Sequence, residues 1–125
     1  MNKLENLSNF TGTENYYTNP LYPFEYTDGV KYLAENGGGY WILDAIASWQ
    51  KELDLSQIQF LSQIQFWRLK VNPDSSAVLT CDRGNMNDIV CKQKIPFTDF
   101  PLSEIVLYLC GMGNAKGVLL LPSEY

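Results

Sequence analysis

The chain has 125 residues, of which 46% are hydrophobic and 18% are charged. This is the length of one globular domain, and the apolar content excludes an intrinsically disordered chain. The net charge of −5 disfavours a general binder of nucleic-acid backbones, which needs a positive surface. Residues 1–55 hold eight acids and three bases, whereas residues 56–125 hold six of each, so the excess negative charge lies in the first half.

The sequence contains three cysteines and no histidine. Without histidine there is no Ser-His or Cys-His dyad, no imidazole base and no histidine metal ligand. The odd number of cysteines and a polar N-terminus without a secretory signal indicate reduced thiols and a cytoplasmic protein. The longest apolar run, residues 105–110, is far shorter than the about 20 residues that cross a membrane. We therefore expect no membrane association, no cofactor and no metal.

We expect a single domain over residues 1–125, in which residues 1–9 are disordered or loosely held. In the first half, tyrosine-rich runs and helical periodicity predict two strands followed by two helices. The strands cover residues 14–18 and 24–27, and the helices cover about residues 29–35 and 40–53. Thr27-Asp28 provides the cap of the first helix, and Asn36-Gly37 provides its stop.

The second helix has one apolar side, because Ile42, Ile46 and Trp49 fall on a single helical stripe. A six-residue unit, Leu-Ser-Gln-Ile-Gln-Phe, then occurs twice in succession, at residues 55–60 and 61–66. Two copies are too few for a repeat fold, so we interpret them as a local duplication that lengthens the link between helix and sheet. The second copy leads into a strand, and the first extends the helix or forms a loop.

The remaining sequence alternates between apolar and polar residues, which is typical of β-strands. Strands are predicted over residues 65–71, 76–82, 88–95, 104–110 and 118–121. Because turns separate them in sequence, the strands pair antiparallel. The predicted fold is therefore α+β: an antiparallel sheet of five to seven strands with two helices packed on one face. Trp67 and Leu69 face the helices, and Phe66, Arg68 and Lys70 face the other way.

Cys81 and Cys91 are a candidate redox pair. If residues 85–87 form the turn between their strands, the two cysteines lie directly opposite each other. Opposed β-carbons lie about 4.5–5.5 Å apart, and a disulfide needs about 3.5–4.5 Å, so a strained cross-strand disulfide is conceivable. The favoured alternative is a pair of buried thiols on the core face, beside Leu79 and Ile95.

The same register predicts a cationic surface on the other side of the sheet. Its residues are Phe66, Arg68, Lys70, Lys92 and Lys94, with Val78 and Thr80 between them. Basic side chains around an aromatic ring can bind an anion, a small ligand or a single-stranded nucleic acid. The overall acidity favours the alternative of a solvated face that keeps the sheet from aggregating. Self-association with the acidic first half of a second copy is a further option.

Three other features have both a structural and a functional interpretation. Residues 111–117 are glycine-rich and follow an apolar strand, but no helix follows that could present amides to a phosphate, so we predict a hairpin turn. Ten of the 17 aromatic residues lie between Phe10 and Trp49 and suit either a recognition surface or, as we favour, a core. Carboxylate-dependent hydrolysis would need two of the acids Asp28, Asp44, Asp99 and Glu104 at a set separation.

Five segments together resemble an uncharacterised family, a domain of unknown function found in small bacterial proteins and frequent in cyanobacteria. The segments are FTGTENYY (10–17), YTDGVKY (26–32), YWILDAIA (40–47), FTDFPL (97–102) and LLLPSEY (119–125). They span nearly the whole chain from Phe10 onward. The resemblance implies no activity, cofactor or site residue, and the doubled six-residue unit departs from the family pattern.

Taken together, these features favour a non-catalytic binding or regulatory module that acts through protein contacts. The absence of histidine, nucleophile motifs and metal-ligand clusters disfavours an enzyme, and abundant tyrosine suits a recognition surface. The partner is then another protein or a second copy of the chain. The alternatives are an anion, a small ligand or single-stranded nucleic acid on the cationic surface, and a carboxylate-dependent hydrolase.

Overall fold

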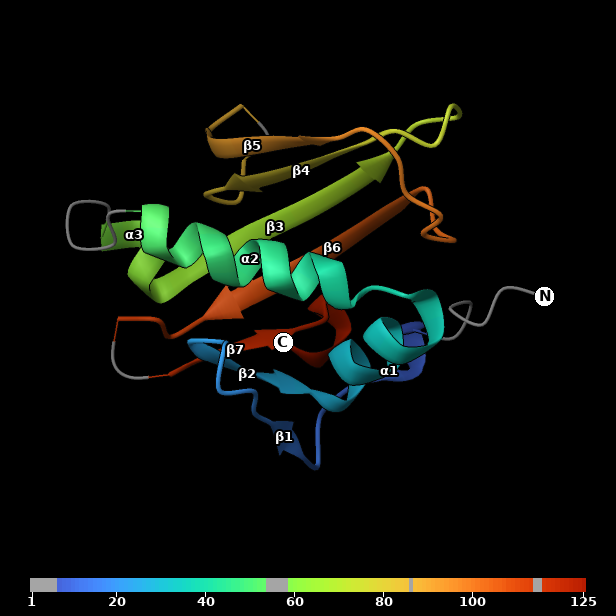
Figure 1. Ribbon diagram of the computed structural model, residues 1–125. Coiled ribbons are helices and arrows are strands. Elements are labelled where there is room, and N and C mark those ends of the chain that lie inside the picture. Colours follow the sequence, from blue (N-terminus) through green and yellow to red (C-terminus); the bar gives the residue numbers. More distant parts are fainter. Residues whose placement is uncertain (1–6, 54–58, 86, 114–115) are drawn as a thin grey trace.

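Figure 1 shows the computed structural model, which describes residues 7–53, 59–85, 87–113 and 116–125. The described strands are β1 (Tyr16–Tyr17), β2 (Phe24–Thr27), β3 (Ile64–Val71), β4 (Ala77–Asp82), β5 (Ile89–Ile95), β6 (Glu104–Cys110) and β7 (Gly117–Leu120). The helices are α1 (Asp28–Gly37), α2 (Tyr40–Glu52) and α3 (Gln59–Gln63), with short 3-10 helices η1 (Leu7–Asn9) and η2 (Pro122–Glu124). The predicted α+β class is confirmed.

The strands form one sheet in the order β1-β2-β7-β6-β3-β4-β5. The prediction of a purely antiparallel sheet is wrong at one pair, because β2 runs parallel to β7. The direction of β7 is set by its hairpin with β6, and β2 then pairs with the free side of β7. Sequential turns report only neighbouring strands, so they carry no information about this pairing of distant segments.

The helices lie on one face of the sheet, as predicted. In Figure 1, α1 and α2 lie in front of the strands, and α2 crosses over β3 and β6. Alternation along the strands and the apolar stripe of α2 bring the buried side chains together between these layers. The buried residues of this layer include Ile42, Leu43, Ile46, Trp67, Leu69, Leu79, Leu107 and Leu109. Trp49 packs against this core and donates a hydrogen bond from Nε1 to Gln93 Oε1 at 2.9 Å.

The start of α1 is held by two carboxylates. Thr27 caps the helix, and Glu124 of η2 accepts hydrogen bonds from Thr27 Oγ1 at 2.6 Å and Gly29 N at 3.1 Å. Asp28 accepts from Glu14 N at 2.9 Å and from the Tyr17 hydroxyl at 2.8 Å. Anions at a helix N-terminus satisfy its free N–H groups and its dipole, so these contacts tie the chain ends to the helix.

A buried amide pair joins α2 to the sheet. Gln50 Nε2 donates to Gln65 Oε1 at 2.9 Å, and Gln65 Nε2 donates back to Gln50 Oε1 at 2.8 Å. Trp67 Nε1 also donates to Gln65 Oε1, at 2.9 Å. Gln65 has no solvent exposure, so these partners satisfy an amide that would otherwise be costly to bury.

The duplicated unit meets the sheet at its second copy, as predicted. Leu61 is buried and Ile64 begins β3. Residues 55–58 of the first copy lie outside the described residues, and α3 spans the junction of the two copies.

At the N-terminus, residues 1–6 also lie outside the described residues, and the described chain begins with residues 7–9. They form η1, and Leu7 is 9% exposed within the hydrophobic core. Burial of this one apolar side chain orders a segment that is otherwise polar. No helix in the described part of the chain combines the length and apolar character needed to cross a membrane.

Candidate binding groove on the open sheet face

The five residues of the predicted cationic surface share the sheet face opposite the helices. Arg68 lies opposite Thr80, and Lys70 lies opposite Val78. On the other side of β4, Thr80 lies opposite Lys92 and Val78 opposite Lys94. Cross-strand partners project from the same face, so the register brings these side chains together. Phe66 lies next to Arg68 along this face of β3, because alternate residues of a strand share a face.

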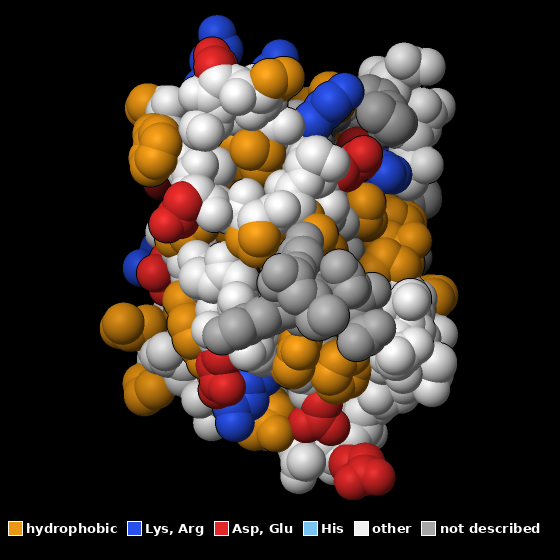
Figure 2. Space-filling view, turned by 90° about the vertical axis from the view of Figure 1, so that its right-hand side faces the viewer, with side chains coloured by type: hydrophobic (Ala, Val, Ile, Leu, Met, Phe, Trp, Pro, Cys, Tyr) orange, Lys and Arg blue, Asp and Glu red, His pale blue; other side chains and the backbone are white. Residues whose placement is uncertain are grey.

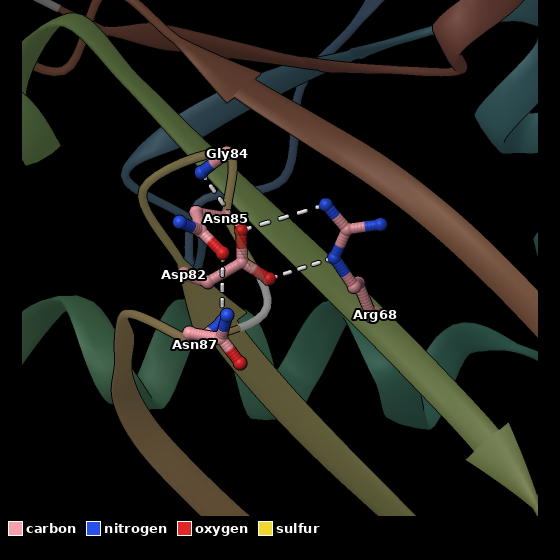
Figure 3. A network of polar contacts seen from close by, with 5 residues as sticks. All are labelled: Arg68, Asp82, Gly84, Asn85 and Asn87. Carbon is pink, nitrogen blue, oxygen red and sulfur yellow. Dashed lines mark hydrogen bonds and ion pairs between the residues drawn. The ribbon is translucent and has the colours of Figure 1, made fainter.

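Arg68 is neutralised by a carboxylate that sequence reasoning did not include. Its Nε donates to Asp82 Oδ2 at 2.7 Å, and its Nη2 lies 3.5 Å from Asp82 Oδ1 (Figure 3). The hydrogen bond to Asp82 raises the pKa of Arg68, which keeps the guanidinium charged. The Asp82 side chain is 1% exposed and that of Arg68 is 23% exposed, so the pair is partly desolvated.

The turn after β4 fixes the position of Asp82. Gly84 N donates to Asp82 Oδ1 at 2.8 Å, so Figure 3 shows the carboxylate between a guanidinium and a backbone amide. Gly84 has a φ of 99°, and a Cβ there would lie 3.1 Å from the Phe66 ring. Glycine is therefore required both by backbone conformation and by the contact with Phe66. The backbone N–H of Asn87 donates a hydrogen bond to Asn85 Oδ1 at 2.9 Å, which is a further contact within the turn.

A groove of about 250 Å³ opens over these strands. Its lining residues are Arg68, Lys70, Val78, Thr80, Asp82, Ile89, Lys92 and Glu104. Three cations and two carboxylates leave one net positive charge in the groove of a chain whose net charge is −5. The other two predicted residues, Phe66 and Lys94, are cross-strand neighbours of the lining residues Asp82 and Val78.

The surface is less uniformly cationic than predicted. Asp82 binds Arg68, and Glu104 is the cross-strand neighbour of Lys70. Lys92 and Lys94 face Thr80 and Val78 instead, so their cross-strand neighbours on β4 are uncharged. Figure 2 shows a different side of the molecule, the right-hand side of Figure 1, where basic and acidic side chains lie in small separate groups.

An aromatic row lies beside the groove on the same face. Tyr108 faces Phe66 across β6 and β3, with ring centroids 4.9 Å apart, and Tyr125 packs on Tyr108 at 5.5 Å. Both contacts are edge-to-face, with interplanar angles of 75° and 87°. Tyr125 is 77% exposed, so the row ends in an accessible ring.

Sequence reasoning did not place four of the residues on this face: Asp82, Glu104, Tyr108 and Tyr125. Asp82 follows Thr80 at a spacing of two, so alternation along β4 already indicated its side. The pairing of β6 with β3 brings Glu104 and Tyr108 to the face, and that pairing joins segments far apart in the sequence. Tyr125 follows directly after the 3-10 helix η2, and no strand or helix was predicted for these last residues.

The other candidate carboxylates have separate positions and partners. Asp28 lies at the start of α1, where its hydrogen bonds with Glu14 and Tyr17 lower its pKa to about 2. Asp44 on α2 accepts from the Tyr22 hydroxyl at 2.5 Å, and Asp99 is exposed in the segment between β5 and β6. Within the described ranges, no group of three or more His, Cys, Asp or Glu residues could hold a metal ion.

The glycine-rich segment 111–117 connects β6 to β7, which pair antiparallel, so the predicted hairpin is confirmed. Residues 114 and 115 within it lie outside the described residues. The dense N-terminal aromatics are divided between core and surface. Tyr22, Phe24 and Tyr26 are buried, whereas Tyr16 is 56% exposed.

Cys81 and Cys91 lie directly opposite each other on β4 and β5, in the register that the turn predicts. Both are free and buried on the core face, and Cys110 is a third free thiol. A register shift between Cys81 and Asp82 places Asp82 opposite Ile89, which differs from the uninterrupted register assumed for the turn.

The fold and groove together define an α+β protein with helices on one face of its sheet and a mixed-charge groove on the other. The chain belongs to a family of unknown function, DUF6876, which matches residues 1–125. Neither the curated proteins nor the solved structures contain a match to the chain.

Proposed function

We propose that the protein is a non-catalytic binding module that holds an acidic segment of a partner protein on the open face of its sheet. The groove between β3, β4 and β5 carries the proposal, because it combines an apolar floor with a net positive rim. Lys92 and Lys94 supply accessible charge at this rim, and Val78 supplies apolar contact.

The volume of the groove suits a single side chain of a partner protein better than a cofactor. Its volume of about 250 Å³ is below the roughly 300–1,000 Å³ of sites that enclose small organic ligands. One carboxylate side chain of a partner fits such a hollow and would meet Lys70 and Lys92. Arg68 would add attraction from the guanidinium nitrogen that Figure 3 draws free of Asp82.

The neighbouring aromatic row suits a protein partner. Tyrosine, phenylalanine and arginine are enriched in the centres of protein interfaces, and the row adjoins Arg68 through Phe66. Single-stranded nucleic acids instead use rings that lie open for stacking. Here the edge-to-face packing of Phe66, Tyr108 and Tyr125 leaves the rings turned against one another, and the chain is acidic overall.

The groove does not offer the two accessible carboxylates that hydrolysis would need. Asp82 is committed to Arg68 and Gly84, so its oxygens already have partners. That leaves Glu104 as the accessible carboxylate among the lining residues, whereas glycoside-type hydrolysis needs two.

Peptide display tests the proposal. A random peptide library is selected on the wild-type protein, and the enriched peptides are measured against two charge-reversed variants. Lys92→Glu with Lys94→Glu changes the groove rim, and Lys51→Glu with Lys116→Glu makes the same change in net charge at exposed positions elsewhere. We expect enriched peptides to carry Asp or Glu and to lose at least roughly tenfold in affinity only for the rim variant.

Two further arms separate the alternative ligands. Inorganic phosphate and oligothymidylate are titrated against the same variants across salt concentrations. Suppose that either ligand binds tightly in a salt-dependent way, and that the peptides bind the rim variant as strongly as the wild type. The ligand of the groove would then be an anion or a nucleic acid and not a protein.

A further inference from the structure

The two opposed cysteines form a dithiol in the core side of the sheet. Cys81 on β4 and Cys91 on β5 are direct cross-strand partners, with exposures of 0% and 9%. Directly opposed side chains have β-carbons about 4.5–5.5 Å apart, so their sulfur atoms need only a small approach to bond. Cys110 lies elsewhere, on β6, where its ladder partners are Ile64 and Val118.

The local structure permits that approach. β5 is an edge strand, so it pairs only with β4 and can shift toward it without disturbing another strand. The register also changes between Cys81 and Asp82, beside the pair. An irregularity of this kind bends and twists the strand locally, which gives the backbone freedom that a regular ladder lacks.

A hollow lies on the same side of β5 as Cys91. A hollow of about 180 Å³ is lined by Ser48, Trp49, Glu52 and Gln93, between α2 and β5. Gln93 and Cys91 project from the same face of β5, because they are two residues apart in one strand. The hollow is therefore lined by the next residue of β5 on the Cys91 side, and Cys91 is the more exposed of the two thiols.

The two thiols also have different acidities. The interaction with the Cys81 thiol lowers the pKa of Cys91, whereas the same contact and burial raise the pKa of Cys81. Burial raises the pKa of Cys110. The thiolate is the reactive form of cysteine, so the lowered pKa and the greater exposure of Cys91 favour it over Cys81 as the attacking thiol.

We propose that Cys81 and Cys91 are a peroxide-responsive pair that closes to an intramolecular disulfide. The Cys91 thiolate attacks hydrogen peroxide, so an S–O bond forms, the O–O bond breaks, and the released hydroxide takes up the thiol proton as water. Cys81 then attacks the Cys91 sulfur, an S–S bond forms as the S–O bond breaks, and the sulfenic hydroxyl leaves with the Cys81 proton as a second water. Two electrons pass from the sulfurs to the peroxide. This inference is independent of the proposed binding function.

Mass spectrometry of the peroxide-treated full chain tests the proposal. We expect a mass loss of two hydrogen atoms, at a rate independent of protein concentration and reversed by a dithiol reductant. Trypsin cleaves after Lys70, Arg83 and Lys92, so the disulfide joins the fragments 71–83 and 84–92. Cys110 remains free for alkylation, and Cys110→Ser behaves like the wild type.

A register control separates cross-strand geometry from general reactivity. Combining Cys91→Ser with Lys92→Cys moves the thiol by one residue to the open face, opposite Thr80, and should abolish the joined fragments. A wild-type chain in which Cys81 and Cys91 stay reduced after peroxide treatment, whether or not Cys110 reacts, would overturn the proposal. Because the wild type itself is the main sample, poor folding of a variant does not obscure the result.

Discussion

At the scale of single residues, the open face depends on one partly desolvated ion pair. Asp82 accepts from both Arg68 and Gly84, and its side chain is 1% exposed. Removal of one member of such a set leaves the others buried without a partner, which costs more than the pair itself contributes. Asp82 thus fixes the position of the Arg68 guanidinium among the residues that line the groove.

We expect Asp82→Asn to lower the free energy of unfolding by about 1–3 kcal/mol. Arg68 is partly exposed, so the effect stays below that of a fully buried pair. A double-mutant cycle tests the pair: the free energy of unfolding in urea is measured for Asp82→Asn, for Arg68→Gln and for the double variant. The pair is coupled if the double variant loses less than the sum of the single variants, and simple additivity would contradict it.

Gly84 and Gly38 offer a matched comparison of backbone and contact effects. Both have positive φ, 99° and 63°, but only Gly84 has the Phe66 ring within 4 Å of a new Cβ. We expect Gly38→Ala to cost roughly 1 kcal/mol and Gly84→Ala to cost more, because Phe66 must also move. Equal losses in thermal or urea unfolding would show that the Phe66 contact is unimportant.

Asp28 predicts an acid-dependent part of stability. Its pKa is about 2 in the folded chain against an ordinary value of 3.8, because Glu14 N and Tyr17 donate hydrogen bonds to it. A depressed folded pKa stabilises the protein above pH 3.8, and that contribution is lost as the pH falls toward 2. Asp28→Asn should therefore be less stable than the wild type at neutral pH, and the gap should close over this range in urea titrations. A gap that stays constant would contradict the assignment.

At the scale of elements, the joint between α2 and β3 is a buried polar network. Gln65→Leu removes the oxygen that accepts hydrogen bonds from Gln50 Nε2 and Trp67 Nε1, and Gln50 Nε2 then keeps its bond to Ile46 O. We expect a loss of about 2–3 kcal/mol in the free energy of unfolding. Gln63→Leu changes an exposed side chain in the same segment and should stay within about 0.5 kcal/mol of the wild type. Equal stability of the two variants would argue against the network.

Some strand bounds and pairings could be predicted from local sequence patterns, and others could not. The strand predicted over 104–110 has the observed bounds of β6, because alternation and flanking turns are local signals. The opposition of Cys81 and Cys91 could likewise be predicted from one turn. The parallel pairing of β2 with β7 could not, because it depends on segments that meet only after the sheet assembles. The same is true of the cap that Glu124 supplies to α1.

At the scale of the whole molecule, one feature of the candidate site was predictable and another was not. Alternation placed Arg68, Lys70, Lys92 and Lys94 on one face. Their electrostatic effect was overestimated, because charge depends on cross-strand and diagonal neighbours such as Asp82 and Glu104. The resulting groove is positive by one charge in an acidic protein, which favours an acidic segment over a highly charged polyanion.

The most direct test of the open face as a binding surface is site-specific photo-crosslinking in the cells that produce the protein. A photoreactive residue replaces Val78 in the groove or, as the control, exposed Ser48 on α2. We predict one crosslinked protein product from the Val78 position, absent from the Ser48 position and lost when Lys92 and Lys94 are both changed to Glu. Identical products from the two positions, or a Val78 product that persists with both lysines reversed, would contradict the account.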